Sequence, residues 1–169
     1  MTDQEMWKNS VEMARLFAIR NCRDSALTDN AEWLAKARLI PKPKWAPWPK
    51  SSTTVSSKEV WINENFTGGD IVSRAAHLIH ESEHLLQYRD VGRLSFLWQY
   101  ATSPSFRLWA EVGATKASLR WQRGLVPSWS PNFSAIAEHI FEAYSVSRAL
   151  AAQIALDLAD WWVITKPKN

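Results

Sequence analysis

The sequence predicts an α+β fold that is predominantly helical, and three observations support this. Apolar residues recur at helical spacing over most of the chain, a short central stretch alternates as strands do, and one proline-rich connector interrupts the helices. With 169 residues, of which 46% are hydrophobic, the chain is long enough to bury a core as a single domain, 1–169. We expect N-terminal helices (1–40), a Pro/Trp connector (41–52), a central core (53–122) and a long C-terminal helix (132–164).

The N-terminal part is predicted to contain two helices followed by the connector. Apolar residues at helical spacing cover 3–20, and Thr28 begins a second short helix that runs to Ala37. Four prolines between Ile40 and Lys50 exclude a regular helix and a central strand. We expect Trp45 and Trp48 to pack this connector onto the body as an ordered strap. The alternative is a proline-rich ligand for a partner domain.

The central stretch reads as a small antiparallel β element that packs on a helix. Thr53–Val55 is β-prone, and Glu59–Asn63 alternates apolar and polar residues. A turn leads into a helix over Ile71–Asp90, which contains neither Pro nor Gly. Asp70 can cap the start of this helix, and Gly92 can end it.

The motif His80-Glu81-Ser82-Glu83-His84 lies inside this predicted helix. His80 and His84 are four residues apart, so both imidazoles lie on one helix face and can reach one Zn²⁺. Glu81 lies about 100° round the helix from His80, where it can accept a proton without binding the ion. The pattern is H-E-x-x-H. The alternative is a solvated helix face that happens to hold two histidines.

The chain after Gly92 is predicted to be helical in three pieces. Leu94–Tyr100 forms a short apolar helix, and a second helix runs from Ser103 or Pro104 to about Gln122. From Ser134 to about Trp162, apolar residues follow one helical stripe, which predicts a single long helix.

A catalytic zinc usually has three protein ligands, so the motif needs a third. His77 is on the same straight helix, and three ligands there would spread along roughly 10 Å of its axis, too far to converge. Glu111 is the best candidate, because it is the only acid in an apolar stretch and its neighbours are small. An ion pair between Glu111 and Arg107 is the alternative. Weaker candidates for the third ligand lie on the last helix, at Glu138, His139 and Glu142.

Composition excludes several classes of protein. The formal net charge is only +3 and no basic tract is present, so we expect no nucleic-acid partner. The single cysteine, Cys22, allows no internal disulfide. No uncharged apolar run reaches the roughly 18 residues of a membrane span, and no signal-like N-terminus is present. We therefore expect a soluble, cytoplasmic protein, unless another system exports it, and the sequence does not indicate an oligomeric state.

These residues resemble the zincin metallopeptidases, in particular the gluzincin branch and small bacterial and phage zincin-like domains. The resemblance covers about 53–122 and rests on three segments: Val60–Asn63, His80–Arg89 and Trp109–Glu111. Ser82 departs from a position that is often apolar, and Glu83 adds a negative charge near the site or faces water. The metzincin pattern fits poorly, because Gln87 and Asp90 stand where its Gly and third His would be.

The resemblance implies a zinc-dependent hydrolase that cleaves a peptide or protein substrate. It implies Zn²⁺ held by His80, His84 and Glu111, with Glu81 as general base. Tyr144 is the first choice for stabilising the oxyanion, ahead of His139 and Arg148, although a core aromatic is its simpler interpretation. Two other functions remain open: a zincin-shaped binding module without catalysis, and a cell-wall amide hydrolase.

Overall fold

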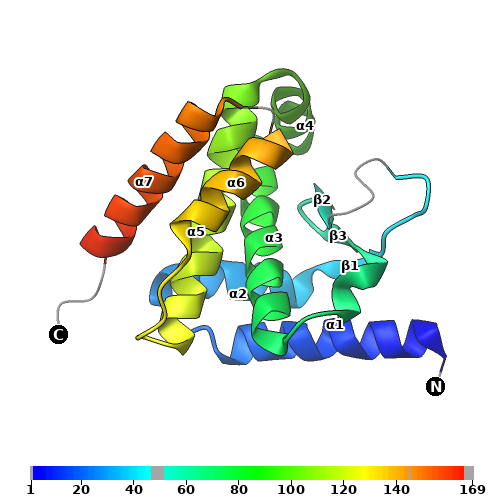
Figure 1. Ribbon diagram of the computed structural model, residues 1–169. Helices are drawn as coiled ribbons and strands as arrows, with labels where there is room; N and C mark the ends of the chain where they lie inside the picture. The colour runs from blue at the N-terminus through cyan, green and yellow to red at the C-terminus, as the bar shows by residue number, and fades with distance from the viewer. Residues whose placement is uncertain (1, 47–51, 145, 166–169) are drawn as a thin grey trace. The chain divides into compact units, whose positions relative to one another are not determined.

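The computed structural model describes residues 2–46, 52–144 and 146–165, and helices dominate it, with one small sheet (Figure 1). This confirms the predicted class, α+β and mostly helical. The chain groups into two compact units, Met1–Trp129 and Ser130–Asn169. Whether they behave as one domain stays a prediction.

Two N-terminal helices begin where the sequence predicts. Helix α1 (Asp3–Arg20) starts with a capping box, in which the Glu5 N–H donates to Thr2 Oγ1 (3.3 Å) and the Thr2 N–H donates to Glu5 Oε2 (2.7 Å). A short 3₁₀ turn, η1 (Ser25–Leu27), leads into α2 (Thr28–Lys36). These helices supply one side of the core of the first unit.

The sheet has three strands in the order β1-β3-β2: β1 (Arg38–Pro41), β2 (Thr53–Ser56) and β3 (Glu59–Ile62). Strands β2 and β3 form the antiparallel element that the sequence predicts. Strand β1 pairs with β3 in parallel and was not predicted, so the sheet is mixed. Because β1 is an edge strand, Pro41 at its end is compatible with the exclusion of a central strand.

The connector is only partly described. The ring of Trp45 lies edge-on to Trp61 of β3, with centroids 5.5 Å apart, although Trp45 is 77% exposed. Trp48 lies outside the described residues. The described part of the strap therefore contacts the body through Trp45 and through Lys42, whose N–H donates to the Ile62 carbonyl at 2.9 Å. The remainder of the strap stays a prediction.

Helix α3 (Ile71–Val91) carries the motif and follows a 3₁₀ turn, η2 (Glu64–Thr67). Asp70 Oδ1 accepts from the Ser73 N–H at 2.9 Å, which confirms the predicted N-cap. Gly92 ends the helix with a φ of 84°, a conformation that glycine adopts without steric cost. The next helix, α4 (Arg93–Thr102), begins immediately after this bend.

Helix α5 (Pro104–Leu125) returns alongside α3 (Figure 1) and ends three residues later than Gln122. Ser103 caps its start, and the buried Trp121 donates its indole N–H to the Ala18 carbonyl of α1 at 2.9 Å. The core of this unit unites α1, α2, β3, α3 and α5; its largest fully buried hydrophobic side chains are Leu34, Val60, Ile62, Leu78, Ile79, Leu85 and Trp121.

The second unit contains two helices, α6 (Phe133–Tyr144) and α7 (Arg148–Ile164), so the prediction of one long helix is wrong. Ser147 starts α7 by accepting from the Leu150 N–H at 3.1 Å. Arg148 binds Glu138 at 2.8 Å. Ten residues of continuous helix would separate these two by about 15 Å along the axis, so the contact requires the chain to reverse.

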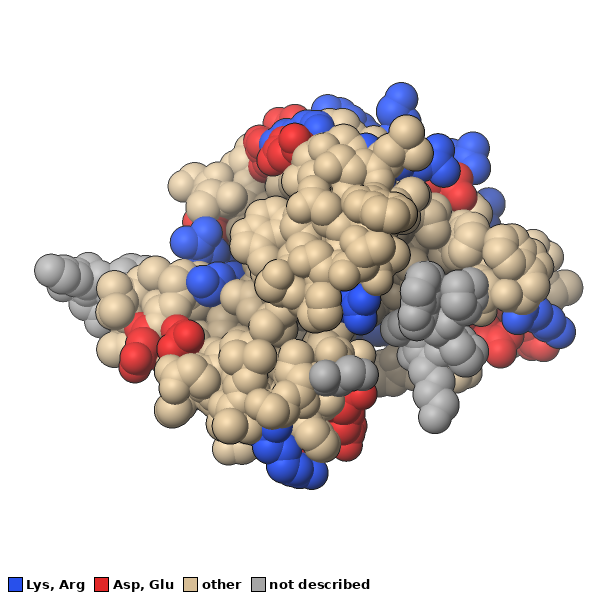
Figure 2. All heavy atoms as spheres, turned by 90° about the horizontal axis from the view of Figure 1, so that it is seen from above, with Lys and Arg blue, Asp and Glu red and all other residues tan. Residues whose placement is uncertain are grey.

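The surface carries charges of both signs. On the face in Figure 2, Lys and Arg side chains form small groups interspersed with Asp and Glu, and much of the area carries neither. Within the described residues, no helix combines the length and apolarity needed to cross a bilayer.

Candidate metal centre

Two helices bring three potential metal ligands together. His80 and His84 come from α3, and Glu111 comes from α5. His80 Nε2 lies 3.3 Å from Glu111 Oε2, and His84 Nε2 lies 3.6 Å from Glu111 Oε1. One candidate ligand atom from each residue lies within 4.8 Å of the others, and this is the one such group in the described part of the chain.

The spacing and chemistry of this cluster fit a zinc ion. Zinc bonds of 2.0–2.2 Å at tetrahedral angles place two ligand atoms about 3.4 Å apart. The distances of 3.3 and 3.6 Å are close to that value, each to a different oxygen of Glu111, and the three ligand atoms that one ion would use lie within 4.8 Å of one another. Two imidazoles and one carboxylate are a ligand set that catalytic zinc uses, and three protein ligands leave one position for water or substrate.

Glu111 is buried and has no arginine partner in the described structure. Arg107 instead donates to the backbone carbonyls of Tyr100 (3.0 Å) and Ala101 (3.3 Å). The alternative of an Arg107–Glu111 ion pair therefore has no support. A buried carboxylate needs a cationic or metal partner, and the two histidines are the groups beside it.

The charges of the cluster are strongly coupled. Burial raises the pKa of Glu111, but the hydrogen bonds and charges of His80 and His84 outweigh it and hold this pKa far below its usual range. Burial lowers the pKa of His84, but the hydrogen bond and charge of Glu111 outweigh that effect and raise the pKa to about 9. Without a metal, His84 therefore carries the proton, beside an ionised Glu111.

Tyr100 of α4 provides a second contact to the same carboxylate. Its hydroxyl donates to Glu111 Oε1 at 2.5 Å. Burial, followed by the charge of Glu111, raises the pKa of Tyr100, so the hydroxyl keeps its proton and remains a donor. Tyr100 also stacks on Phe96, whose ring is 6.4 Å from that of His84. The carboxylate is thus held from three sides.

Glu81 lies beside the cluster but does not belong to it. It is only 4% exposed, and its Oε2 accepts from the Thr54 hydroxyl of β2 at 2.7 Å. The same hydroxyl lies 3.2 Å from the Glu81 carbonyl. Its Oε1 lies 3.6 Å from His77 Nε2. The sheet therefore fixes one oxygen of Glu81 and leaves the other on the side of His77.

The other polar residues around the motif on α3 make contacts outside the ligand group. The His77 ring stacks parallel to that of His80, with centroids 6.3 Å apart, and lies outside the ligand group, as expected. Glu83 accepts from the Asn30 side chain of α2 at 2.8 Å. Ser82 is fully buried and donates to the Ile79 carbonyl at 2.7 Å, which satisfies a hydroxyl at this often apolar position.

The candidates on the last predicted helix belong to the second unit. Glu138 pairs with Arg148, and the rings of His139 and Tyr144 lie 6.1 Å apart. Neither Glu138, His139 nor Glu142 belongs to the described ligand group. The role of Tyr144 in stabilising an oxyanion stays a prediction.

Sequence reasoning missed three side chains that support the cluster: Thr54, Gln87 and Tyr100. Gln87 had a local signal, because it lies three residues after His84 on the same helix face. Its Oε1 is 2.8 Å from His84 Nδ1. Thr54 and Tyr100 reach the site from other elements, and no spacing along the sequence indicates that.

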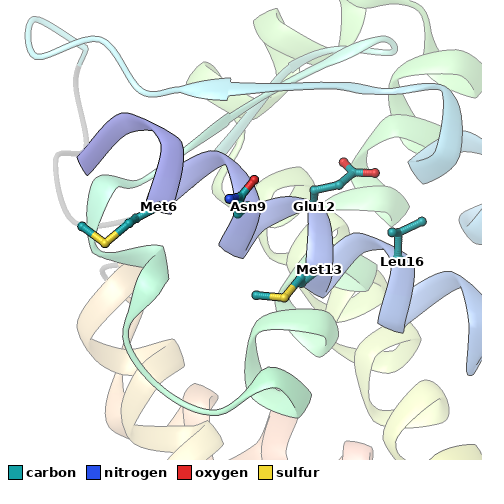
Figure 3. A pocket seen from close by; sticks show the side chains of 5 residues that line it. All are labelled: Met6, Asn9, Glu12, Met13 and Leu16. Carbon is teal, nitrogen blue, oxygen red and sulfur yellow. The ribbon is translucent and has the colours of Figure 1, made fainter. Parts of the chain in front are cut away.

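A groove on α1 shares no residue with the metal cluster. It encloses about 420 Å³ and is lined by Met6, Asn9, Glu12, Met13 and Leu16 (Figure 3). All five residues come from one helix, and none of them is a metal-ligand type except Glu12. This groove therefore adds no chemistry to the candidate site.

Comparison with known proteins gives no relatives: no family model, curated protein or solved structure matches this chain. The resemblance to zincins rests on the motif and its surroundings alone.

Proposed function

We propose that this protein is a zinc-dependent hydrolase, most simply a metallopeptidase that cleaves an amide bond of a peptide or protein. The observation that carries the proposal is the convergence of His80, His84 and Glu111 beside a buried Glu81. The motif alone predicts two of these ligands. The third comes from another helix and meets them at a distance suited to one ion.

Zinc, when bound, supplies a Lewis acid that polarises a carbonyl and lowers the pKa of water. The protein's own residues supply the ligands and the proton transfer. Glu81 accepts a proton from the attacking water and returns it to the leaving amine. Thr54 donates to Oε2, so Oε1, which lies 3.6 Å from His77 Nε2, is the oxygen proposed for this transfer. Tyr144 remains the proposed stabiliser of the oxyanion.

Metal analysis and a peptide-library digest test the proposal together. We expect about one zinc per chain after purification, and cleavage that a chelator stops and added Zn²⁺ restores. Glu81→Gln should keep the zinc and lose about 10²–10⁴-fold in rate, as is typical when a positioned general base is removed. Glu83→Gln is the matched control, because that carboxylate binds Asn30 instead.

The outcomes separate the open functions. Stoichiometric zinc with no cleavage of peptides or cell-wall amides would identify a binding module. Cleavage of cell-wall amides alone would identify the other class of hydrolase. A protein that retains its zinc after both His80 and His84 are changed to Ala would overturn the metal centre itself.

A further inference from the structure

We propose that Gln87 is a positioning residue that fixes the ring of His84 and joins the two ligand-bearing helices. The inference rests on the proposed metal centre and adds a residue that the H-E-x-x-H pattern does not contain. Gln87 lies on α3, is buried, and makes two side-chain contacts in opposite directions. Each contact constrains the other, as the donor and acceptor chemistry shows.

The first contact fixes the orientation of the amide. Gln87 Nε2 lies 2.9 Å from the backbone carbonyl of Ala110 on α5. A carbonyl only accepts hydrogen bonds, so the group that faces it must be the NH₂ of the amide. The carbonyl oxygen of Gln87 must therefore point the other way, toward His84.

The second contact then fixes the histidine. Gln87 Oε1 lies 2.8 Å from His84 Nδ1 and can only accept, so Nδ1 must carry a proton. In the neutral imidazole, the lone pair is then on Nε2, the atom that lies 3.6 Å from Glu111 Oε1. Gln87 thus selects the tautomer and the ring orientation that a metal ligand needs.

The position of Ala110 gives this bridge a second effect. Ala110 directly precedes Glu111, so the same amide that orients His84 also holds the backbone next to the carboxylate ligand. One side chain therefore links two of the three proposed ligands, which come from different helices. Without this bridge, only the packing of α3 against α5 would set the distance between these two ligands.

Gly113 provides the space for the bridge. A Cβ at position 113 would lie 2.9 Å from Gln87 Nε2, closer than carbon and nitrogen atoms approach without a bond. Because Gly113 is in the middle of α5, it costs helix stability of about 1 kcal/mol relative to Ala. A close approach to a polar side chain is a physical reason for glycine at this position. Gly124 on the same helix has ordinary contacts, with the Arg23 Cβ 3.4 Å away.

Zinc affinity, measured by chelator competition with the full-length protein, tests the proposal. Gln87→Ala should weaken zinc binding about 10–100-fold, the usual cost of losing a partner that orients a ligand. Gly113→Ala should also weaken it, whereas Gly124→Ala should not. The double variant Gln87→Ala/Gly113→Ala should bind zinc as Gln87→Ala does, because the amide that Gly113 accommodates is gone.

Nuclear magnetic resonance of the zinc-loaded protein supplies a second readout, which reports directly on the two ring nitrogens of His84. The ¹⁵N signals of His84 should show a protonated Nδ1 and a zinc-bound Nε2, and the Nδ1 proton should exchange faster in Gln87→Ala. Zinc bound through Nδ1 would overturn the proposal. So would unchanged affinity in Gln87→Ala, with the metal centre intact; failure of the wild-type protein to bind Zn²⁺ would overturn both.

Discussion

His84 and His80 come from the same helix and face the same carboxylate, yet their surroundings differ. The side chain of His84 is 9% exposed, and its Nδ1 meets Gln87. That of His80 is 22% exposed, stacks on His77 and, among the described residues, has no hydrogen-bond partner for its second ring nitrogen. The site thus has a buried half around His84 and Glu111, and a more open half around His80, although the neighbouring Glu81 is itself buried.

This difference leads us to expect different roles for the two halves of the site. In the buried half, every polar atom that faces the site has a partner, which fixes geometry at the cost of mobility. In the open half, the rings of His77 and His80 and the Oε1 atom of Glu81 are less constrained. We expect the buried half to determine metal affinity and the open half to determine reactivity.

The largest effect should follow removal of a ligand. In His84→Ala and in His80→Ala, zinc should fall from about one per chain to near none, because two ligands do not form a stable site. His84→Ala should also lower the melting temperature of the metal-free protein more, since it removes a partner of both Glu111 and the buried Gln87, whereas His80→Ala removes a partner of Glu111 alone. Elemental analysis and thermal unfolding measure both quantities. Equal melting temperatures in the two variants would contradict the comparison.

The next effect concerns the residue that holds Glu81. Thr54→Val keeps the shape of the side chain and removes the hydroxyl that binds Oε2. We expect the hydrolytic rate to fall about 10–100-fold, while zinc content is unchanged. Thr53→Val is the matched control on the adjacent position of β2, where the hydroxyl accepts from Lys42 instead. Loss of zinc in Thr54→Val would place Thr54 in the metal-holding half.

Tyr100→Phe should act on the buried half alone. It removes the hydroxyl that donates to Glu111 Oε1, so zinc affinity should weaken about tenfold, at the lower end for such partners. Tyr88→Phe is the control, because Tyr88 belongs to the same aromatic cluster and has no described contact with Glu111. Chelator competition measures the affinity, and an unchanged value in Tyr100→Phe would exclude this role.

The metal-free protein should have a distinctive dependence of stability on pH. The pKa of His84 is raised from 6.5 to about 9, so its contribution is complete below pH 6.5 and is lost as pH rises through about 9. The pKa of Glu111 is lowered from 4.5, so its contribution is present above pH 4.5 and is lost at more acidic pH. Stability from this pair should therefore be greatest between about pH 4.5 and 6.5.

Bound zinc should abolish the loss of stability at alkaline pH. Zinc replaces the proton between His84 and Glu111, so the loaded protein should keep its melting temperature from pH 6.5 to 9. Thermal unfolding with and without a chelator compares the two states, and the Glu111→Gln variant should lose the decline seen in the metal-free protein. A parallel decline in the loaded and metal-free proteins would refute this account.

The smallest effect is expected at His77. His77→Gln removes a ring that stacks on His80 but lies outside the ligand group, so zinc affinity should change by less than about twofold. A larger loss, measured by the same chelator competition, would show that the open half also contributes to metal affinity.

Where the sequence predicted the fold well, the signals were local. The sequence predicts both ends of α3, at Asp70 and Gly92, because a cap and a positive φ act within one turn of the helix. The split between α6 and α7 was missed because the apolar stripe continues through it, and Ser147, a good N-cap residue, was overlooked. Strand β1 was missed because it pairs in parallel with β3, twenty-one residues further on (Arg38 with Glu59).

The sequence by itself determined the spacing of His80 and His84 and the adjacent Glu81, since 3.6 residues per turn place them by local geometry. It made Glu111 a candidate through its apolar surroundings. Only the tertiary structure decided that Glu111 meets the two histidines, that Tyr100 and Thr54 hold the carboxylates, and that Gln87 bridges α3 and α5. Those contacts depend on how separate elements pack, and packing distances are not encoded in the spacing of residues along one helix.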